Sequence, residues 1–156
     1  MQRLKRATSS ARVGVLPKSR RRTLYVISMG TWVTGAVWLI YHYFVTSVDQ
    51  FGFENVHPYQ HGWLVAHGVF AVAAAWMFGV LWPNHVLRGW KAKVRRTSGG
   101  WLFGVVTWLM LTGVALYYIG STEWRAWTSL AHWIVGLATL LPFLIHWYTR
   151  SRIDMP

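Results

Sequence analysis

The stretch that decides the fold is AWTSLAHWIVGLATLLPFLIHWY, residues 126 to 148, an apolar run without Lys, Arg, Asp or Glu. A helix of about 20 such residues crosses the roughly 30 Å hydrocarbon core of a bilayer. The run carries two histidines, His132 and His146, fourteen positions apart. At 3.6 residues per turn, these positions lie within about 40° of one another around the helix and about 21 Å apart along it. The sequence therefore predicts two imidazoles that face the same way near opposite ends of a membrane span.

Three further runs have the same character, at residues 23–46, 61–82 and 100–118, and none of them contains a charged residue. Of the 156 residues, 54% are hydrophobic and 13% are charged, a composition typical of membrane proteins. Because lipid offers no hydrogen bonds to the backbone, apolar runs of this length are expected to be helices. The predicted fold class is all-α, a multi-pass membrane four-helix bundle.

The basic residues predict the orientation of this bundle. Of 16 Lys and Arg residues, eight precede the first run, five lie between the second and third, two follow the fourth, and only Arg125 falls in an outer loop. The positive-inside rule then places both termini in the cytoplasm. We expect a basic cytoplasmic arm at 1–22, the four-helix domain at 23–150 and a cytoplasmic tail at 151–156. The net charge of +12 follows from this topology and from attraction to anionic lipids, so nucleic-acid binding is not needed to explain it.

Two alternatives for the arm stay open. Ser19-Arg20-Arg21-Arg22 before an apolar run fits a twin-arginine export signal, and the acid-free composition fits an organelle transit peptide. The long run that follows, with no small-residue cleavage site, favours a permanent span. The chain has no cysteine, which excludes disulfides, thiolate metal sites and covalent c-type haem attachment within it.

The second run repeats the histidine pattern of the fourth. His67 lies near its start, and His85 follows eighteen positions later, five helical turns on and so on the same face. Runs two and four both lead from outside to inside, so His67 and His132 match in depth. We predict one haem iron between His67 and His132 on the outer side and a second between His85 and His146 on the inner side. Two imidazoles leave no open position on the iron, which suits electron transfer and not oxygen binding.

Other assignments of the histidines remain possible. A single histidine in an apolar helix is often a packing residue, but four at matched depths favour ligation. His42, near the outer end of the first run, is the rival ligand for the outer haem, while His57 and His61 are expected in the loop and at the membrane interface. Pro83 should kink or end the second helix, although His85 needs a further turn to point inward. A zinc or copper cluster fits poorly, because its ligands must lie within a few ångströms and these pairs are about 20 Å apart.

The first and third runs also resemble each other. They contain TWVTGAVWLIYHY and TWLMLTGVALYYIG, which align at Thr34-Gly35 and Thr112-Gly113, and each precedes a run with two histidines. The alignment indicates a two-fold repeat of a helix pair. The glycines allow close helix approach and would equally admit a flat macrocycle.

Charge predicts the partners of the haem propionates, which are anionic. The candidate cation for the outer haem is Arg125, and those for the inner haem are Arg88, Arg95, Arg96 and Arg150. The same arginines also serve membrane topology.

The third and fourth runs resemble those of a known family. HWIVG with a second histidine fourteen residues on, and LTGVALYY before it, resemble the small bacterial membrane cytochromes b of the cytochrome b561 and hydrogenase or formate dehydrogenase cytochrome type. The resemblance covers about residues 23 to 150. It implies two b-type haems, electron transfer between quinone and a redox partner protein in a membrane complex, and a bacterial-type inner membrane. The spacing from His67 to His85 is longer than is common in such cytochromes and puts the inner ligand in question.

Two other functions fit the same sequence. A haem-based superoxide or ferric reductase would need an accessible haem edge near Arg125. A cofactor-free structural or anchoring subunit of a larger complex would use the histidines for packing, and would lack a haem spectrum.

Overall fold

The computed structural model describes residues 16–93 and 96–151, with side chains up to residue 148. It contains four helical segments that are long and apolar enough to cross a membrane, which confirms the predicted all-α, multi-pass membrane class. The elements are, in chain order, α2 Lys18–Phe44, β1 Thr46–Val48, β2 Glu54–Val56, α3 Pro58–Leu81, η1 Trp82–Val86, α4 Leu87–Lys91, α5 Arg96–Tyr118, α6 Thr122–Ala138 and α7 Leu140–Ser151.

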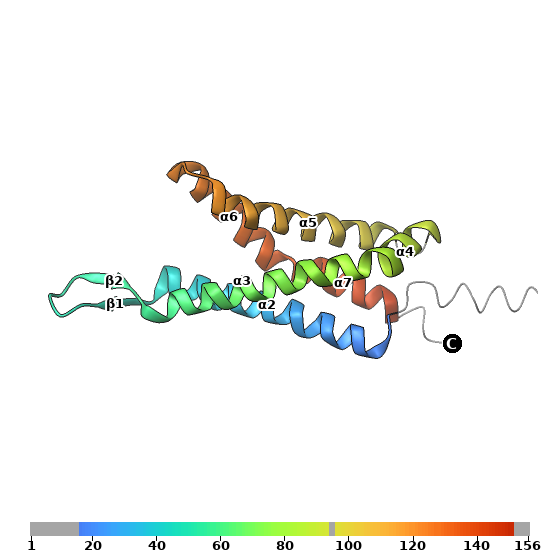
Figure 1. Cartoon of the computed structure of the whole chain (residues 1–156), viewed down its shortest axis with the longest axis horizontal. Helices are drawn as coiled ribbons and strands as arrows, with labels where there is room; N and C mark the ends of the chain where they lie inside the picture. The colour runs from blue at the N-terminus through green and yellow to red at the C-terminus, as the bar shows by residue number, and fades with distance from the viewer. Residues whose placement is uncertain (1–15, 94–95, 152–156) are drawn as a thin grey trace, which may run out of the picture.

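The long helices pack into one bundle (Figure 1). α2 packs along α3, α5 packs along both α6 and α7, and α2 also contacts α6. The ring of Phe103 in α5 lies 5.3 Å from Phe78 and 5.5 Å from Trp82, centroid to centroid, which joins α5 to the α3 side. The ring order is therefore α2, α3, α5, α6, and α3 lies across the bundle from α6.

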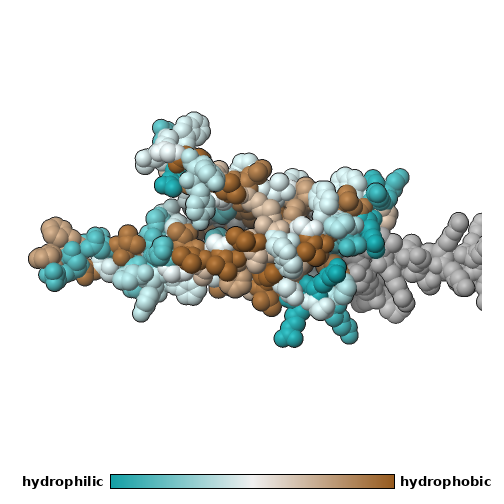
Figure 2. Space-filling model, viewed as in Figure 1, coloured by the Kyte–Doolittle hydropathy of each residue, from teal (hydrophilic) through white to brown (hydrophobic). Residues whose placement is uncertain are grey.

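The two ends of the bundle differ in charge. α2 begins and α7 ends at one end, and the strands β1 and β2 lie at the other (Figure 1). We call the first the basic end, because hydrophilic residues gather there near the start of α2 and around α4 (Figure 2). We call the second the hairpin end. The described cations of the basic end are Lys18, Arg20, Arg21, Arg22, Arg88, Lys91, Lys93 and Arg96.

The surface between the two ends is apolar. Among the described residues, only Thr34, Met77, Leu81 and Thr112 are buried, whereas large apolar side chains such as Val72 are exposed along every span. A water-soluble protein rarely exposes apolar surface on this scale, so lipid is the solvent that suits it. The two buried threonines are the exception to the apolar pattern, and both face histidines.

The hairpin was not predicted, since the sequence indicated only a loop there. β1 pairs with β2 in antiparallel register. Asp49 closes the turn, because its Oδ1 accepts hydrogen bonds from the backbone N–H groups of Phe51 and Phe53, both at 2.9 Å. These bonds, chiefly the one from Phe53, hold the pKa of Asp49 below its ordinary value. Gly52 has φ 84°, a left-handed conformation that glycine adopts without strain.

The second span passes its proline without ending. Pro83 has no N–H for the carbonyl of Gly79, which accepts instead from the N–H of Trp82, and the π-helical segment η1 begins at this point. The N–H of Leu87 bonds to the carbonyl of Trp82, and the chain continues as α4 to Lys91. The helix that Pro83 was expected to kink or end therefore carries His85 onward in helical backbone.

The fourth span is broken where the sequence predicted one continuous helix. Pro142 has no N–H for the carbonyl of Ala138, and the N–H of Thr139 bonds to Gly136 at 3.3 Å in a tighter turn. α6 ends there and α7 begins. No prediction used Pro142, although a proline inside an apolar run is a recognised signal for such a break.

Candidate metal centres

The four predicted ligands form two pairs. His67 of α3 lies beside His132 of α6, with ring centroids 6.3 Å apart and ring planes at 86°. His85 of η1 lies beside His146 of α7, at 6.1 Å and 85°. We call these the hairpin-end pair and the basic-end pair. The structure thus brings together the residues whose depths were predicted to match.

Both centroid distances suit two imidazoles on one metal ion. Each ligating nitrogen lies about 2 Å from the metal and each ring centre about 1.2 Å beyond it, so the centroids end about 6.4 Å apart. Edge-to-face ring contacts fall in the same range. What distinguishes these pairs is the hydrogen bonding of the second ring nitrogen.

The bond that His67 makes determines its tautomer. Its Nδ1 lies 2.9 Å from the carbonyl oxygen of Thr31 in α2. A carbonyl can only accept, so Nδ1 carries the proton and Nε2 keeps a lone pair. The buried Thr34 hydroxyl donates to the carbonyl of Gly30 at 2.6 Å, and its oxygen lies 3.4 Å from the same Nδ1.

His132 is held in the same way by α5. Its Nδ1 lies 2.8 Å from Oγ1 of the buried Thr112. That hydroxyl donates to the carbonyl of Trp108 at 2.8 Å, so its oxygen accepts the Nδ1 proton of His132. Metal-ligating histidines typically donate this second N–H to a carbonyl or hydroxyl, which orients the ring and raises its basicity. Both members of the hairpin-end pair therefore have the protonation that a metal ligand needs.

Glycines lie against the same two rings. A Cβ on Gly35 would lie 2.9 Å from Cε1 and 3.0 Å from Nδ1 of His67, so the ring occupies the space of a missing side chain. Gly113 lies beside His132, where a Cβ would be 3.5 Å from Cε1. The repeat seen in the sequence, Thr-Gly in α2 and in α5, thus supplies matching neighbours to the two histidines.

The basic-end pair is built differently. Nδ1 of His146 lies 3.2 Å from the hydroxyl of Ser98 in α5, which can donate or accept, so this contact leaves the tautomer open. Gly99 lies beside the same ring, where a Cβ would be 3.8 Å from Cε1. His85 is half-buried in the π-helical segment. Ser98 was not predicted, although it stands fourteen positions before Thr112, the same spacing that separates the two histidines of the fourth span, and this was a usable signal.

The remaining histidines lie at the hairpin end. His42, the rival ligand, stacks on Trp38 with centroids 4.7 Å apart and has Nδ1 3.1 Å from the amide nitrogen of Gln60. His57 caps α3 by accepting from the backbone of Tyr59 at 3.3 Å. His61 is exposed near the start of α3.

The predicted arginines are placed only in part. Arg125 donates from Nε and Nη2 to the carbonyl of Leu116, at 3.2 and 3.0 Å, and so satisfies the end of α5. Arg88 is exposed on α4 at the basic end. Arg150 belongs to α7, but its side chain lies outside the described part of the chain, as does the whole of Arg95.

The donor set decides which metal group fits. Within residues 16–93 and 96–151, no three His, Cys, Asp or Glu side chains come together. A zinc site needs three or four protein ligands, whereas a haem brings four nitrogens of its own and needs only two axial ligands. Two separate His pairs, with rings oriented through Nδ1 and glycines beside them, therefore fit haem.

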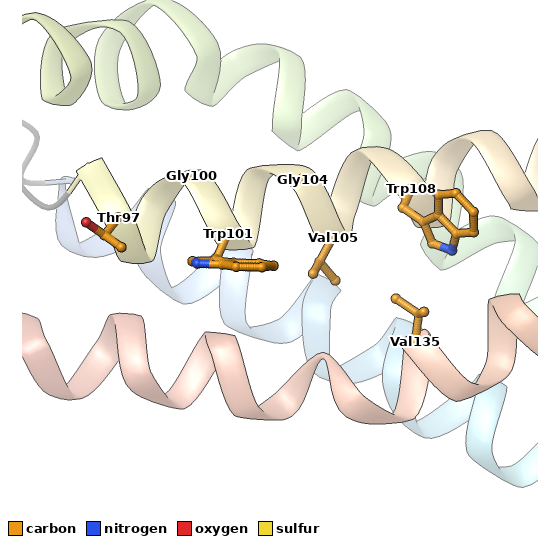
Figure 3. A pocket seen from close by; sticks show the side chains of 7 residues that line it. All are labelled: Thr97, Gly100, Trp101, Gly104, Val105, Trp108 and Val135. Atoms are coloured by element: carbon orange, nitrogen blue, oxygen red, sulfur yellow. The ribbon is translucent and has the colours of Figure 1, made fainter.

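An apolar groove of about 530 Å³ lies between α5 and the part of α6 that carries Val135 (Figure 3). In Figure 3, Trp101 and Val105 of α5 point toward the facing helix that carries Val135. The full lining is Thr97, Gly100, Trp101, Gly104, Val105, Trp108 and Val135, and it includes none of the paired histidines. The groove is thus a feature separate from the two pairs.

Comparisons with protein-family models, with curated proteins and with solved structures find no match to this chain. The assignment of the histidine pairs rests on their own geometry.

Proposed function

We propose that the protein is a di-haem b-type membrane cytochrome that passes electrons across the bilayer between the quinone pool and a redox partner protein. The observation that supports this best is the repetition of one arrangement near both ends of the bundle. Two imidazoles from helices on different sides approach to 6.3 Å in one place and 6.1 Å in the other. One such contact is ordinary packing, but two on the same pair of spans favour two cofactors.

The roles of the side chains follow from their bonds. His67 and His132 offer Nε2 as ligands, while Thr31 and Thr112 hold the Nδ1 protons. His85 and His146 take the same role at the basic end. A haem with two imidazole ligands has no open position and so exchanges electrons without binding a substrate at iron.

The charged residues complete the proposal. Arg88 and Arg150 at the basic end and Arg125 at the hairpin end are the candidates for haem carboxylates. We place both termini in the cytoplasm of a cell with a bacterial-type inner membrane, because the cations gather at the end where α2 begins. This assignment includes kinship with the cytochrome b561 and hydrogenase or formate dehydrogenase cytochromes, which the His, Gly and Trp pattern supports.

The test is a reduced-minus-oxidised visible spectrum of the detergent-purified protein, with haem per chain measured as the pyridine hemochrome. We expect two b haems per chain. His67→Ala and His132→Ala should each remove one of them, and His85→Ala and His146→Ala should each remove the other. His42→Ala is the matched control and should keep both.

The outcomes separate the alternatives. If His42→Ala removes a haem and His67→Ala does not, the rival ligand replaces His67. If no haem is found after expression with ample haem supply, the cytochrome proposal fails, and the histidines become packing residues of a cofactor-free subunit.

A further inference from the structure

Two tryptophans near the hairpin-end pair bury a hydrogen-bond donor without a partner. The Nε1 atoms of Trp38 and Trp133 are inaccessible to solvent, and neither has an acceptor within the part of the chain that the structure describes. An indole nitrogen can only donate, and buried indole N–H groups normally find an acceptor. These two N–H groups therefore need a hydrogen-bond acceptor that the described residues do not provide.

Trp133 is next in sequence to a member of the hairpin-end pair, and Trp38 is close in sequence to a residue that contacts the other member. Trp38 is one helical turn beyond Thr34, on the same face of α2, and Thr34 contacts His67. Trp133 directly follows His132. Its ring is 6.4 Å from that of Tyr43, which shows that α2 and α6 meet at this level.

The direction of the helices places the indoles on the hairpin side of the pair. α2 runs toward the hairpin, so Trp38 lies beyond Thr34 in that direction, and its ring stacks on that of His42, which is one further turn toward the hairpin. Long side chains in a helix lean toward its N-terminus, and α6 starts at the hairpin end, so Trp133 leans back toward the hairpin. Its contact with Tyr43, near the end of α2, agrees with this direction.

Neighbouring rings hold both indoles in place. Trp38 is stacked on His42 with ring planes 12° apart, and His42 is fixed in turn by Gln60. Tyr43 packs edge-on against Trp133 at 64°. The donors are therefore oriented before any acceptor arrives, which lowers the cost of binding one.

We propose that Trp38 and Trp133 donate their indole N–H groups to the two propionate carboxylates of the haem held by His67 and His132. This inference rests on the proposed function. Carboxylates are acceptors only, and hydrogen bonds to ionised acceptors are the strong ones. Two donors match the two carboxylates of the group. Arg125, the cation predicted for the outer haem, instead donates to the carbonyl of Leu116.

The experiment compares haem b with its dimethyl ester, in which both carboxylates are blocked. The full-length chain is produced without haem in the His146→Ala background, so that only the hairpin-end pair binds, and is titrated with each compound in detergent. The protein variants are Trp38→Phe, Trp133→Phe and the double variant, which keep a ring and remove the N–H. Trp127→Phe is the matched control, since Trp127 is on the same helix and 61% exposed.

In the protein with both tryptophans intact, we expect the ester to bind about tenfold to a hundredfold more weakly than haem b. This ratio of dissociation constants is the one expected from the loss of hydrogen bonds to a charged group. In the double variant, the binding of haem b should weaken by a similar factor. The protein's preference for haem b over the ester should then fall to about threefold or less. Trp127→Phe should keep the full preference.

The two proposals fail in different ways. If haem b binds but the ester binds equally well, the carboxylates have no donors at this site, the inference is overturned, and the cytochrome proposal stands. A double variant that keeps the full preference also overturns it. If neither compound binds at all, the proposed function fails first. The ester comparison needs no tryptophan variant, so misfolding of a variant cannot decide it.

Discussion

The hairpin-end pair and the basic-end pair have nearly the same ring separation, yet they are built by different means. His67 and His132 come from regular helix, and their Nδ1 protons are fixed by Thr31 and Thr112. His85 and His146 follow the irregular backbone of η1 and of the α6–α7 break.

The difference shows how two helices of unequal histidine spacing can form two matched pairs. Eighteen residues separate the histidines of the second span and fourteen those of the fourth, which in straight α-helices correspond to about 27 and 21 Å. Each span carries a proline between its histidines, Pro83 in one and Pro142 in the other. The regular half of each span sets the hairpin-end pair, and the irregular half brings the second pair together.

The strongest test of this comparison is Pro83→Ala. Without the proline, η1 can become α-helix, and loss of the wider turn would rotate His85 by up to about 100°, the angle of one residue. On the proposed function, we expect haem content to fall from two to about one per chain by pyridine hemochrome, with the hairpin-end haem retained.

Pro58→Ala is the control for Pro83→Ala, because Pro58 stands at the start of α3, where proline is well tolerated. It should leave both haems. Two haems in Pro83→Ala would mean that tertiary packing, and not the proline, maintains the π-helical segment.

The two glycines of the hairpin-end pair give a second test. Gly35→Ala places a Cβ 2.9 Å from Cε1 of His67, and overpacking of this kind costs about 1–3 kcal/mol. Gly113→Ala places a Cβ 3.5 Å from His132, an ordinary contact, and alanine is the better helix former by up to about 1 kcal/mol. We expect Gly35→Ala to lower thermal stability and hairpin-end haem content.

Gly113→Ala should lower neither thermal stability nor haem content, which makes it the matched control on the other half of the repeat. Equal losses of stability and haem in the two variants would contradict the inference that Gly35 lies closer to its histidine than Gly113 does. Both are measured by thermal denaturation in detergent and by haem per chain.

The sequence predicted the fold because four uncharged apolar runs of membrane-spanning length can only be helices in lipid. It also predicted the pairing, since helices in a bilayer fix depth, and depth alone matched His67 with His132. It did not predict which groups bond the second ring nitrogen, because that depends on the rotation of each helix about its axis. Thr112 was visible in the repeat with Thr34, but only the glycines were given a role.

Other features needed longer-range information. The hairpin depends on one carboxylate, Asp49, bonding two backbone groups across the turn. The indole of Trp133, whose N–H has no acceptor among the described residues, cannot be told from an interfacial tryptophan by its position in the sequence. Pro142, in contrast, was readable, and the broken fourth span follows from its missing N–H.

A smaller effect should separate the pairs by redox potential. Thr112→Val removes the acceptor of the His132 Nδ1 proton, which makes the ligand less basic and raises the midpoint potential of the hairpin-end haem. A hydrogen bond of about 1 kcal/mol corresponds to a shift on the order of tens of millivolts. Ser98→Ala should move only the basic-end wave, and by less, because that contact is longer, at 3.2 Å. Optical redox titration measures both, and a shift of both waves in either variant would show that the sites are not independent.

The smallest effect concerns the hairpin, which lies beyond the hairpin-end pair and could be thought to support it. The lowered pKa of Asp49 keeps its carboxylate ionised below the usual range, so its contribution to the turn is complete above the unfolded pKa and is lost as pH falls through the folded one. The protection factor of the Phe53 amide against hydrogen exchange should fall over that acidic window, and it should be low at all pH values in Asp49→Ala. Both haems should remain in that variant, because the Nδ1 bonds of His67 and His132 join α3 to α2 and α6 to α5 and involve no residue of the hairpin. Loss of the hairpin-end haem in Asp49→Ala would instead assign part of that site to the hairpin.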